Sequence, residues 1–326
     1  MRALLLVVFG TFLSLSAAED LRVLRPLQYS GMCDASGAVA VSSNLFVVAN
    51  DEDNVLRLYG SDQPGQPVKQ FDLNAFLEVQ GKSLEADLEG AARIGDRAFW
   101  IGSHGRNKDG KERPNRHRLF ATDIRVKAGD VTLAPVGKPY KRLLNDLLGD
   151  TRFDQFHLAE AARHAPKEPG ALNIEGLSAT AEGQLLIGFR SPVPAGKALL
   201  IPLLNPNQVI EGKPARFGSA VQLDLGGLGI RDIAWHRGTY FIIAGACDGA
   251  RDFQLYRWAG SDAKPERLLV DHLSRYHPET LFFYPQSALR EFQVLSDDGT
   301  FLINGCPCKD LKDSSRRTFR SFWVAQ

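Results

Sequence analysis

Acidic side chains recur in a four-residue signal that occurs five times along the chain. The copies begin at residues 34, 87, 173, 230 and 277 and read DASG, DLEG, NIEG, IRDI and HPET. The third position is Ser36 in the first copy and a carboxylate in the others: Glu89, Glu175, Asp232 and Glu279. Carboxylates that face one another need a bound cation, an arginine or histidine partner, or raised pKa values, because like charges cannot all stay ionised uncompensated.

Oxygen ligands of this kind favour a hard cation, with Ca²⁺ ahead of Mg²⁺ and Mn²⁺. Residues two apart in a strand point the same way, so the first and third positions of each signal share a direction. The sequence therefore predicts a divalent-cation site with the ligands Asp87, Glu89, Asn173, Glu175, Asp232 and Glu279. The alternative is structural: the same acids would cap strand ends and order buried water, since perturbed carboxylates also occur in structural networks.

A cation in this position would allow hydrolytic chemistry. It would polarise an ester and activate water, while Glu89 or Glu175 takes the proton. Three positive groups follow the strands, and we expect them to hold an anionic ligand: His104, Arg106 and Arg190. Their alternative role is to neutralise neighbouring acids. The basic stretch 106–118 lacks apolar periodicity and is predicted to be a solvated hairpin loop.

The signals precede strands, and this repetition predicts the fold. Each copy is followed by a strand, a short turn and a second strand, as in GAARIGDRAFWIG, and usually by a third strand such as FQLYRW. Antiparallel units repeated in this way are typical of a β-propeller, whose innermost strands line a central channel. We expect an all-β fold, a single β-propeller of five blades, with a sixth blade left open, and a ring of the signals at one mouth of the channel.

Two segments depart from the repeat. Residues 141–170 carry apolar residues at helical spacing until Pro166 and Pro169, which predicts a helical insertion. Residues 21–27 form an unassigned strand at one end of the chain, and SFWVAQ forms another at the other end. Pairing these two strands in one blade would close the ring and remove its exposed edges.

The first residues are typical of a signal peptide. Arg2 precedes an apolar run of about 13 residues, shorter than the roughly 20 that a spanning helix needs, and small residues follow up to Ala18. We therefore predict a signal peptide at residues 1–18, a propeller domain at 19–326, and a periplasmic or secreted location. No later segment is predicted to span a membrane.

The overall composition narrows the range of partners. The formal net charge of +1 gives no sign of a nucleic-acid groove. We expect a monomer that binds a small anionic molecule or a protein ligand on the channel face. The sequence lacks a G-x-S-x-G elbow, a P-loop, a dinucleotide fingerprint and an H-E-x-x-H motif. A non-catalytic binding propeller therefore stands beside the metal-dependent hydrolase of a phosphoester or lactone.

The four cysteines are predicted to form disulfides, because an exported protein meets an oxidising compartment. Cys33 precedes the first signal, whereas the other three cysteines follow the second strands of the fourth and fifth units. These positions are neighbours once the ring closes. We predict that Cys33 bonds to Cys306 or Cys308 and that Cys247 bonds to the other; the alternative is four reduced, buried thiols.

The blocks DLEGAARIGDRAFWIGSHGRN and NIEGLSATAEGQLLIGFRSP resemble a bacterial family called domain of unknown function 3616. This resemblance extends over most of the chain after residue 18 and implies no particular activity. The repeated D/N-x-E-G signal is more loosely similar to that of esterase-like phytases and of calcium-dependent lactonase propellers, whose channel acids bind a divalent cation. Asp87, Glu89, Asn173 and Glu175 match that pattern, whereas Ser36, Ile230 and His277 depart from it.

Overall fold

The computed structural model describes residues 20–250, 252–288 and 291–325. The predicted signal peptide, residues 1–18, lies outside these residues. Within them the chain is mainly β-structure, and its strands pair mostly with their sequence neighbours. Alternating apolar residues make one strand after another, and tight turns such as the one between residues 94 and 97 connect them.

Twenty of the described strands form groups of four, and we name each group by its innermost strand. The first three groups are separate sheets. The β2 group contains β2 (Ala35–Ala40), β3 (Leu45–Asn50), β4 (Asp53–Gly60) and β5 (Lys69–Asp72). The β6 group contains β6 (Leu88–Ile94), β7 (Arg97–Gly102), β8 (Leu119–Lys127) and β9 (Asp130–Tyr140). The β10 group contains β10 (Asn173–Ala179), β11 (Leu185–Ser191), β12 (Ala198–Leu203) and β13 (Val221–Leu223).

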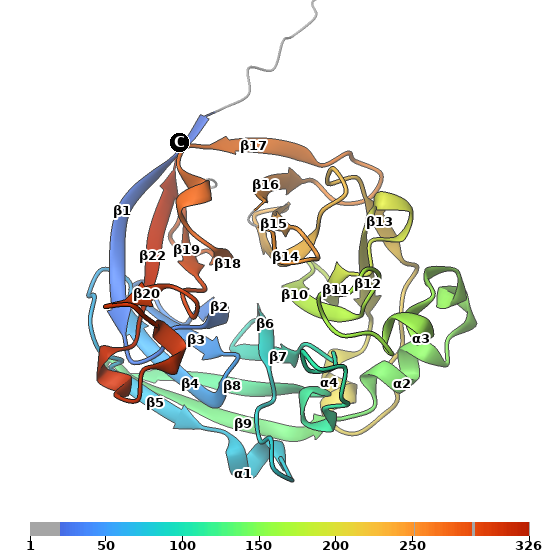
Figure 1. Cartoon of the computed structure of the whole chain (residues 1–326), viewed down its shortest axis with the longest axis horizontal. Helices are drawn as coiled ribbons and strands as arrows, with labels where there is room; N and C mark the ends of the chain where they lie inside the picture. Colours follow the sequence, from blue (N-terminus) through green and yellow to red (C-terminus); the bar gives the residue numbers. More distant parts are fainter. Residues whose placement is uncertain (1–19, 251, 289–290, 326) are drawn as a thin grey trace, which may run out of the picture.

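The other two groups are halves of one eight-stranded sheet. The β14 group contains β14 (Gly229–His236), β15 (Thr239–Gly245), β16 (Phe253–Trp258) and β17 (Glu266–Val270). The β18 group contains β18 (Pro278–Phe282), β19 (Phe292–Ser296), β22 (Thr318–Ala325) and β1 (Asp20–Ser30). β1 pairs antiparallel with β22 along most of its length and meets β17 at two residues only. Figure 1 shows blue β1 alongside red β22, so the two ends of the chain close the ring as expected.

The innermost strands form a closed ring, since β2 contacts β6, β6 contacts β10, and so on through β14 and β18 back to β2. This arrangement confirms the predicted β-propeller (Figure 1). Five clusters of buried apolar side chains fill the spaces between neighbouring groups. Burial of these side chains between the sheets supplies the main stabilisation of such a fold.

Glycine allows the inner strands to approach closely near the channel. A Cβ atom on Gly229 would lie 1.8 Å from the carbonyl oxygen of Arg190, and one on Gly90 would lie 2.7 Å from that of Glu175. Neither backbone oxygen can move without disturbing its own strand. A side chain at either position would therefore push adjacent groups apart exactly where the acidic signals lie.

Helices lie outside this ring. The predicted insertion is confirmed between β9 and β10, as α2 (Leu143–Leu148), the 3₁₀ segment η2 (Thr151–Phe156) and α3 (Leu158–Ala161). Its buried side chains, such as Leu147 and Phe153, join the apolar cluster between the β6 and β10 groups. Short helices also occur at α1 (Asn74–Leu77) and α4 (Pro206–Ile210), and a small hairpin pairs β20 (Leu302–Ile303) with β21 (Cys306–Pro307).

Candidate functional site

A β-bulge interrupts each innermost strand at the position of the repeated signal. In β6 the pairing skips from Leu88 to Gly90, and in β10 from Ile174 to Gly176. The same shift occurs between residues 230 and 232 of β14 and between 278 and 280 of β18. A bulge leaves one residue unpaired and redirects its side chain. The bulged residues are Glu89, Glu175, Arg231 and Glu279.

The expected ring position of Asp232 is therefore wrong by one residue. Arg231 occupies that position, while the Asp232 carboxylate accepts hydrogen bonds from Thr280 Oγ1 at 2.8 Å and from the Leu281 N–H at 2.7 Å. Asp232 thus ties β14 to β18 inside the protein. Burial raises its pKa to about 7, against the lowering effect of these donors.

The three glutamates of the ring lie close together. One carboxylate oxygen of each of Glu89, Glu175 and Glu279 lies within 4.8 Å of the others. The guanidinium of Arg231 reaches between two of them: its Nη1 lies 2.7 Å from Glu279 Oε1 and 3.3 Å from Glu175 Oε2. Arg190 approaches from β11, with its Nη1 2.6 Å from Glu175 Oε1. Two of the three glutamates are therefore neutralised by arginines.

Glu89 is the exception. Among the described residues it has no hydrogen bond and no ion pair. Its pKa is raised well above the usual value, first by burial and then by the charges of Asp87, Glu175, Asp51 and Glu279. A carboxyl group with a strongly perturbed pKa inside a cavity is a common feature of functional sites.

Asp87 is held from another direction. Arg116 lies at the end of the short segment η1 (Pro114–Arg116), and its Nη1 lies 2.9 Å from Asp87 Oδ2. The same guanidinium bonds to Glu85. Burial raises the pKa of Asp87 to about 6, although Arg116 and Ser103 act in the opposite sense. The basic loop is therefore not simply solvated as expected, because Arg116 folds back to the channel mouth.

Glu89, Asp87 and Arg116 line a cavity of about 770 Å³ at the channel mouth. Asp51, Asp87, Glu89, Asn173 and Arg190 are among its lining residues. Several buried acceptor atoms here have no hydrogen-bond donor: Asp51 Oδ1, Asn173 Oδ1 and Glu175 Oε2. Glu175 Oε2 lies 3.3 Å from the Nη1 of Arg231. Buried polar atoms are normally satisfied, so these oxygens require a donor or a cation.

Two of the three residues expected to bind an anion lie elsewhere. His104 Nδ1 is 2.8 Å from the carbonyl oxygen of Gly102, and its ring stacks on His117. Burial lowers the pKa of His104 to about 3, so the ring is neutral near pH 7. Arg106 binds the carbonyl oxygens of Gly110 and Ala162, which fastens the loop to the insertion.

Both side chains therefore have structural partners, and His104 and Arg106 do not line the cavity. Arg190 does line it, as the position of its strand led us to expect. His104 has a positive φ of 56°, just after the end of β7.

A family model matches the chain over residues 34–134 and 126–281 and is described as "Protein of unknown function (DUF3616)". The chain belongs to this family. The two matched segments include the signals at residues 34, 87, 173, 230 and 277, so the expectation drawn from those motifs is confirmed. A comparison of this DUF3616 chain with curated proteins gives no match.

Among solved structures, the chain is similar to Myxococcus xanthus glutaminyl cyclase, with 13% identity, a TM-score of 0.48 and coverage of 94% of this chain and 95% of that one. The PQQ-bound aldose sugar dehydrogenase of Streptomyces coelicolor has 11% identity and a TM-score of 0.45, with coverage of 95% and 99%. The Bacillus subtilis arabinanase Arb43A has 12% identity and a TM-score of 0.42, with coverage of 90% and 93%. We draw no functional conclusion from these likenesses.

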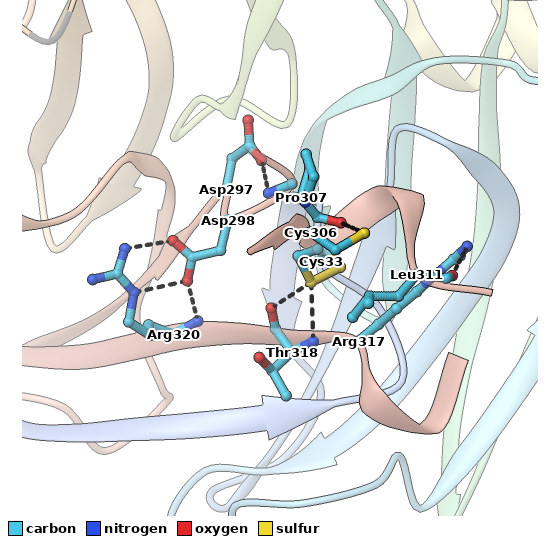
Figure 2. Close-up of a disulfide and its surroundings, with 11 residues drawn as sticks. Cys33, Asp297, Asp298, Cys306, Pro307, Leu311, Arg317, Thr318 and Arg320 are labelled. Carbon is cyan, nitrogen blue, oxygen red and sulfur yellow. Dashed lines mark hydrogen bonds and ion pairs between the residues drawn. A yellow bond between two sulfur atoms is a disulfide. The ribbon is translucent and has the colours of Figure 1, made fainter. Parts of the chain in front are cut away.

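The cysteines follow the prediction in part. Cys33 is bonded to Cys308 across a sequence separation of 275, which confirms the first predicted pair. Figure 2 shows this disulfide beside Thr318 of β22, whose N–H donates to Cys308 Sγ at 3.3 Å. Cys247 and Cys306 are both free, so the second predicted pair is wrong.

The local contacts account for this difference. Cys306 lies in the β20–β21 hairpin, and Cys247 Sγ donates instead to the carbonyl oxygen of Arg190 at 2.9 Å.

In the described part of the chain, none of the helices combines the length and apolar character needed to cross a membrane.

Proposed function

We propose that the protein is an exported binding propeller that holds a divalent cation, Ca²⁺ first, together with a small anionic ligand at the channel mouth. The observation that carries this proposal is the approach of Glu89 to Glu175 and Glu279 within 4.8 Å, together with the acceptor oxygens Asn173 Oδ1 and Glu175 Oε2, which lack hydrogen-bond donors. Asp87, Asn173 and Glu175 would complete the ligand set with Glu89. Carboxylate and amide oxygens are the ligands that Ca²⁺ prefers, and Ca²⁺ tolerates irregular geometry.

The charges around the channel support a cation. Arg190 and Arg231 are already committed to Glu175 and Glu279, and Arg116 is committed to Asp87 and Glu85. Glu89 therefore has no arginine partner among the described residues. A cation bound to Glu89 and to the free Oδ1 of Asn173 would satisfy both groups without breaking an existing ion pair.

The arginines support an anionic ligand. Arg190 lines the cavity, and its buried Nε has no hydrogen-bond partner. Lys108, Arg113 and Lys167 lie along the wall of the same cavity. An anion that reached the cation would therefore also meet donors suited to carboxylate or phosphate oxygens.

Export is proposed on two grounds. The first eighteen residues have the order of a signal peptide. The disulfide between Cys33 and Cys308 is the kind of bond that persists in an oxidising compartment. Intact-mass measurement of periplasmic or secreted material should give a chain that begins at or near Glu19; a chain that retains Met1 would reject export with cleavage.

The cation is tested by calorimetric titration of chelator-treated protein with Ca²⁺, Mg²⁺ and Mn²⁺. We expect Glu89→Gln to weaken Ca²⁺ binding at this site at least tenfold, since a neutral amide replaces the unpaired carboxylate. Glu168→Gln is the matched control, because Glu168 lines the same cavity but is exposed and already bonded to His164. Absence of binding by all three cations, or equal binding by the two variants, would reject this site.

A second candidate function is hydrolysis of a phosphoester or a lactone. It is favoured by Glu89, whose raised pKa and lack of a partner suit a group that exchanges protons with bound water. Glu175 is less suited to that role because Arg190 and Arg231 occupy its carboxylate. Here the cation would polarise the ester, and Arg190 would orient its anionic part. A panel of chromogenic phosphoesters and lactones, assayed with wild-type protein and Glu89→Gln, distinguishes catalysis from binding.

A further inference from the structure

A second group of carboxylates lies where the ring closes and shares the cavity with Glu89. Asp34 immediately precedes β2 and forms an isolated β-bridge with Asp297, just after β19. Asp51 and Glu52 form the turn between β3 and β4. One oxygen of each of Asp34, Asp51 and Glu52 lies within 4.8 Å of the other two. Three side chains from two separate segments therefore converge beside the junction of the β2 and β18 groups.

Asp34 is buried without a partner. It is only 6% exposed, and among the described residues its carboxylate has no hydrogen bond and no ion pair. The glycine at position 299 leaves room for this carboxylate, because a Cβ atom there would lie 1.6 Å from Asp34 Oδ1. Asp51 Oδ1 is also buried and has no hydrogen-bond partner. One oxygen of Asp34 and one of Asp51 therefore lie within 4.8 Å of each other.

The charges of this group are only partly balanced. Lys309 Nζ lies 2.9 Å from Glu52 Oε1, and this ammonium is the one described cation in contact with the three carboxylates. Asp297 adds a further negative charge next to Asp34. Burial, followed by Asp297 and Glu52, raises the pKa of Asp34 to about 7. Desolvated charges of this kind are costly unless a counter-ion or a proton is bound.

We propose that Asp34, Asp51 and Glu52 form a second divalent-cation site, selective for Ca²⁺, which joins the start of β2 to the β3–β4 turn beside the junction with the β18 group. Ca²⁺ binds oxygens at about 2.3–2.6 Å, so ligands on opposite sides of one ion are about 4.6–5.2 Å apart. The three carboxylate oxygens lie within 4.8 Å of one another, which is close enough for one ion to contact all three. Backbone carbonyls or water would complete the coordination shell.

The position of this site gives it a mechanical role. Asp34 follows Cys33, and Lys309, which holds Glu52, follows Cys308. The Cys33–Cys308 bond, shown in Figure 2, therefore joins the residue before Asp34 to the residue before Lys309. A cation here would link the β3–β4 turn to the start of β2 next to the same disulfide. This site uses none of the residues Asp87, Glu89, Asn173 and Glu175, so it does not rest on the proposed function.

The experiment separates the two sites by calorimetric titration of chelator-treated protein with Ca²⁺. If both sites bind, wild-type protein takes up two ions per chain, Glu89→Gln retains the ion at this site, and Glu89→Gln combined with Asp34→Asn takes up none. Glu52→Gln serves as a second variant, because Glu52 is exposed and its replacement does not disturb the core. Asp310→Asn is the matched control: this exposed residue lines the same cavity but does not belong to the carboxylate group.

The melting temperature measured without Ca²⁺ shows whether the Asp34→Asn variant folds. Because Asp34→Asn removes a buried, unpaired charge, we expect its melting temperature in chelator to equal or exceed that of wild-type protein, while the gain produced by Ca²⁺ becomes smaller. The proposal is overturned if Asp34→Asn and Glu52→Gln bind as many Ca²⁺ ions as wild-type protein, or if Glu89→Gln alone abolishes all binding. Loss of one ion in Asp34→Asn but none in Glu89→Gln would support this site and reject the cation at Glu89.

Discussion

Replacement of Arg231 by methionine tests the electrostatic account of the channel. Its Nη1 lies 2.7 and 2.8 Å from the two oxygens of Glu279 and 3.3 Å from Glu175 Oε2. At an effective dielectric constant of about 20, a pair of unit charges about 3 Å apart attract by roughly 5–6 kcal/mol before desolvation is counted, and the two contacts to Glu279 belong to one such pair. Removing one partner of a buried ion pair costs about 3–5 kcal/mol net, because the other charge stays buried. We expect Arg231→Met to lower the free energy of unfolding by about that amount.

Urea unfolding followed by tryptophan fluorescence measures this loss at pH 7.5 in the presence of chelator. Arg231→Lys keeps a positive charge but loses the planar guanidinium, so we expect a smaller loss. The double variant Arg231→Met, Glu279→Gln should be more stable than Arg231→Met alone, since it also removes one of the stranded carboxylates. A loss below about 1 kcal/mol in Arg231→Met, or a double variant less stable than the single one, would refute the account.

Two further predictions concern stability. Replacing both Cys33 and Cys308 with serine should lower the free energy of unfolding by several kcal/mol, because the chain-entropy model gives about 5–6 kcal/mol for a loop of this length. A urea midpoint equal to that of the Cys247→Ser control would contradict this prediction. The buried Asp232 has its pKa raised to about 7, so the native state binds a proton that the unfolded state releases, and stability falls as pH rises through 7. Between pH 6 and pH 8 the free energy of unfolding falls by about 1.4 kcal/mol from this group. Asp232→Asn should therefore flatten the dependence of melting temperature on pH in that range. An unchanged slope would rule out Asp232 as the source of the pH dependence.

The fold was largely predictable from the sequence because its determinants are local. Alternating strands follow each signal, and two leftover end strands, now β1 and β22, pair with each other. The helical spacing of Leu143, Leu144 and Leu147 identified the insertion between β9 and β10. Each of these features depends on the periodicity of a short segment. The pairing of Cys33 was predictable for a related reason, since ring closure makes the first and last units neighbours.

Side chains that reach the site through a long loop were harder to predict. Arg116 lies in a basic stretch with no apolar periodicity, and its sequence context alone indicates a solvated loop. Its role depends on contacts with Glu85 and Asp87, about thirty residues earlier in the chain. The free state of Cys247 was hard to predict for the same reason. Its thiol donates to the carbonyl oxygen of Arg190, which lies in the β10 group. Such contacts become visible only when the groups are packed together.

The error at Asp232 has a more specific origin and changes the chemistry of the site. Aligning the fourth signal by its acidic residue gives Ile230-Arg231-Asp232, whereas the bulges align Gly229-Ile230-Arg231 with Asp87-Leu88-Glu89. The apolar second position, occupied by Leu88, Ile174 and Ile230, carries the correct register, because that side chain is buried between the sheets. A shift of one residue exchanges a carboxylate for a guanidinium. The ring is therefore three glutamates around the guanidinium of Arg231, which pairs with Glu175 and Glu279 and leaves Glu89 without an ion pair among the described residues.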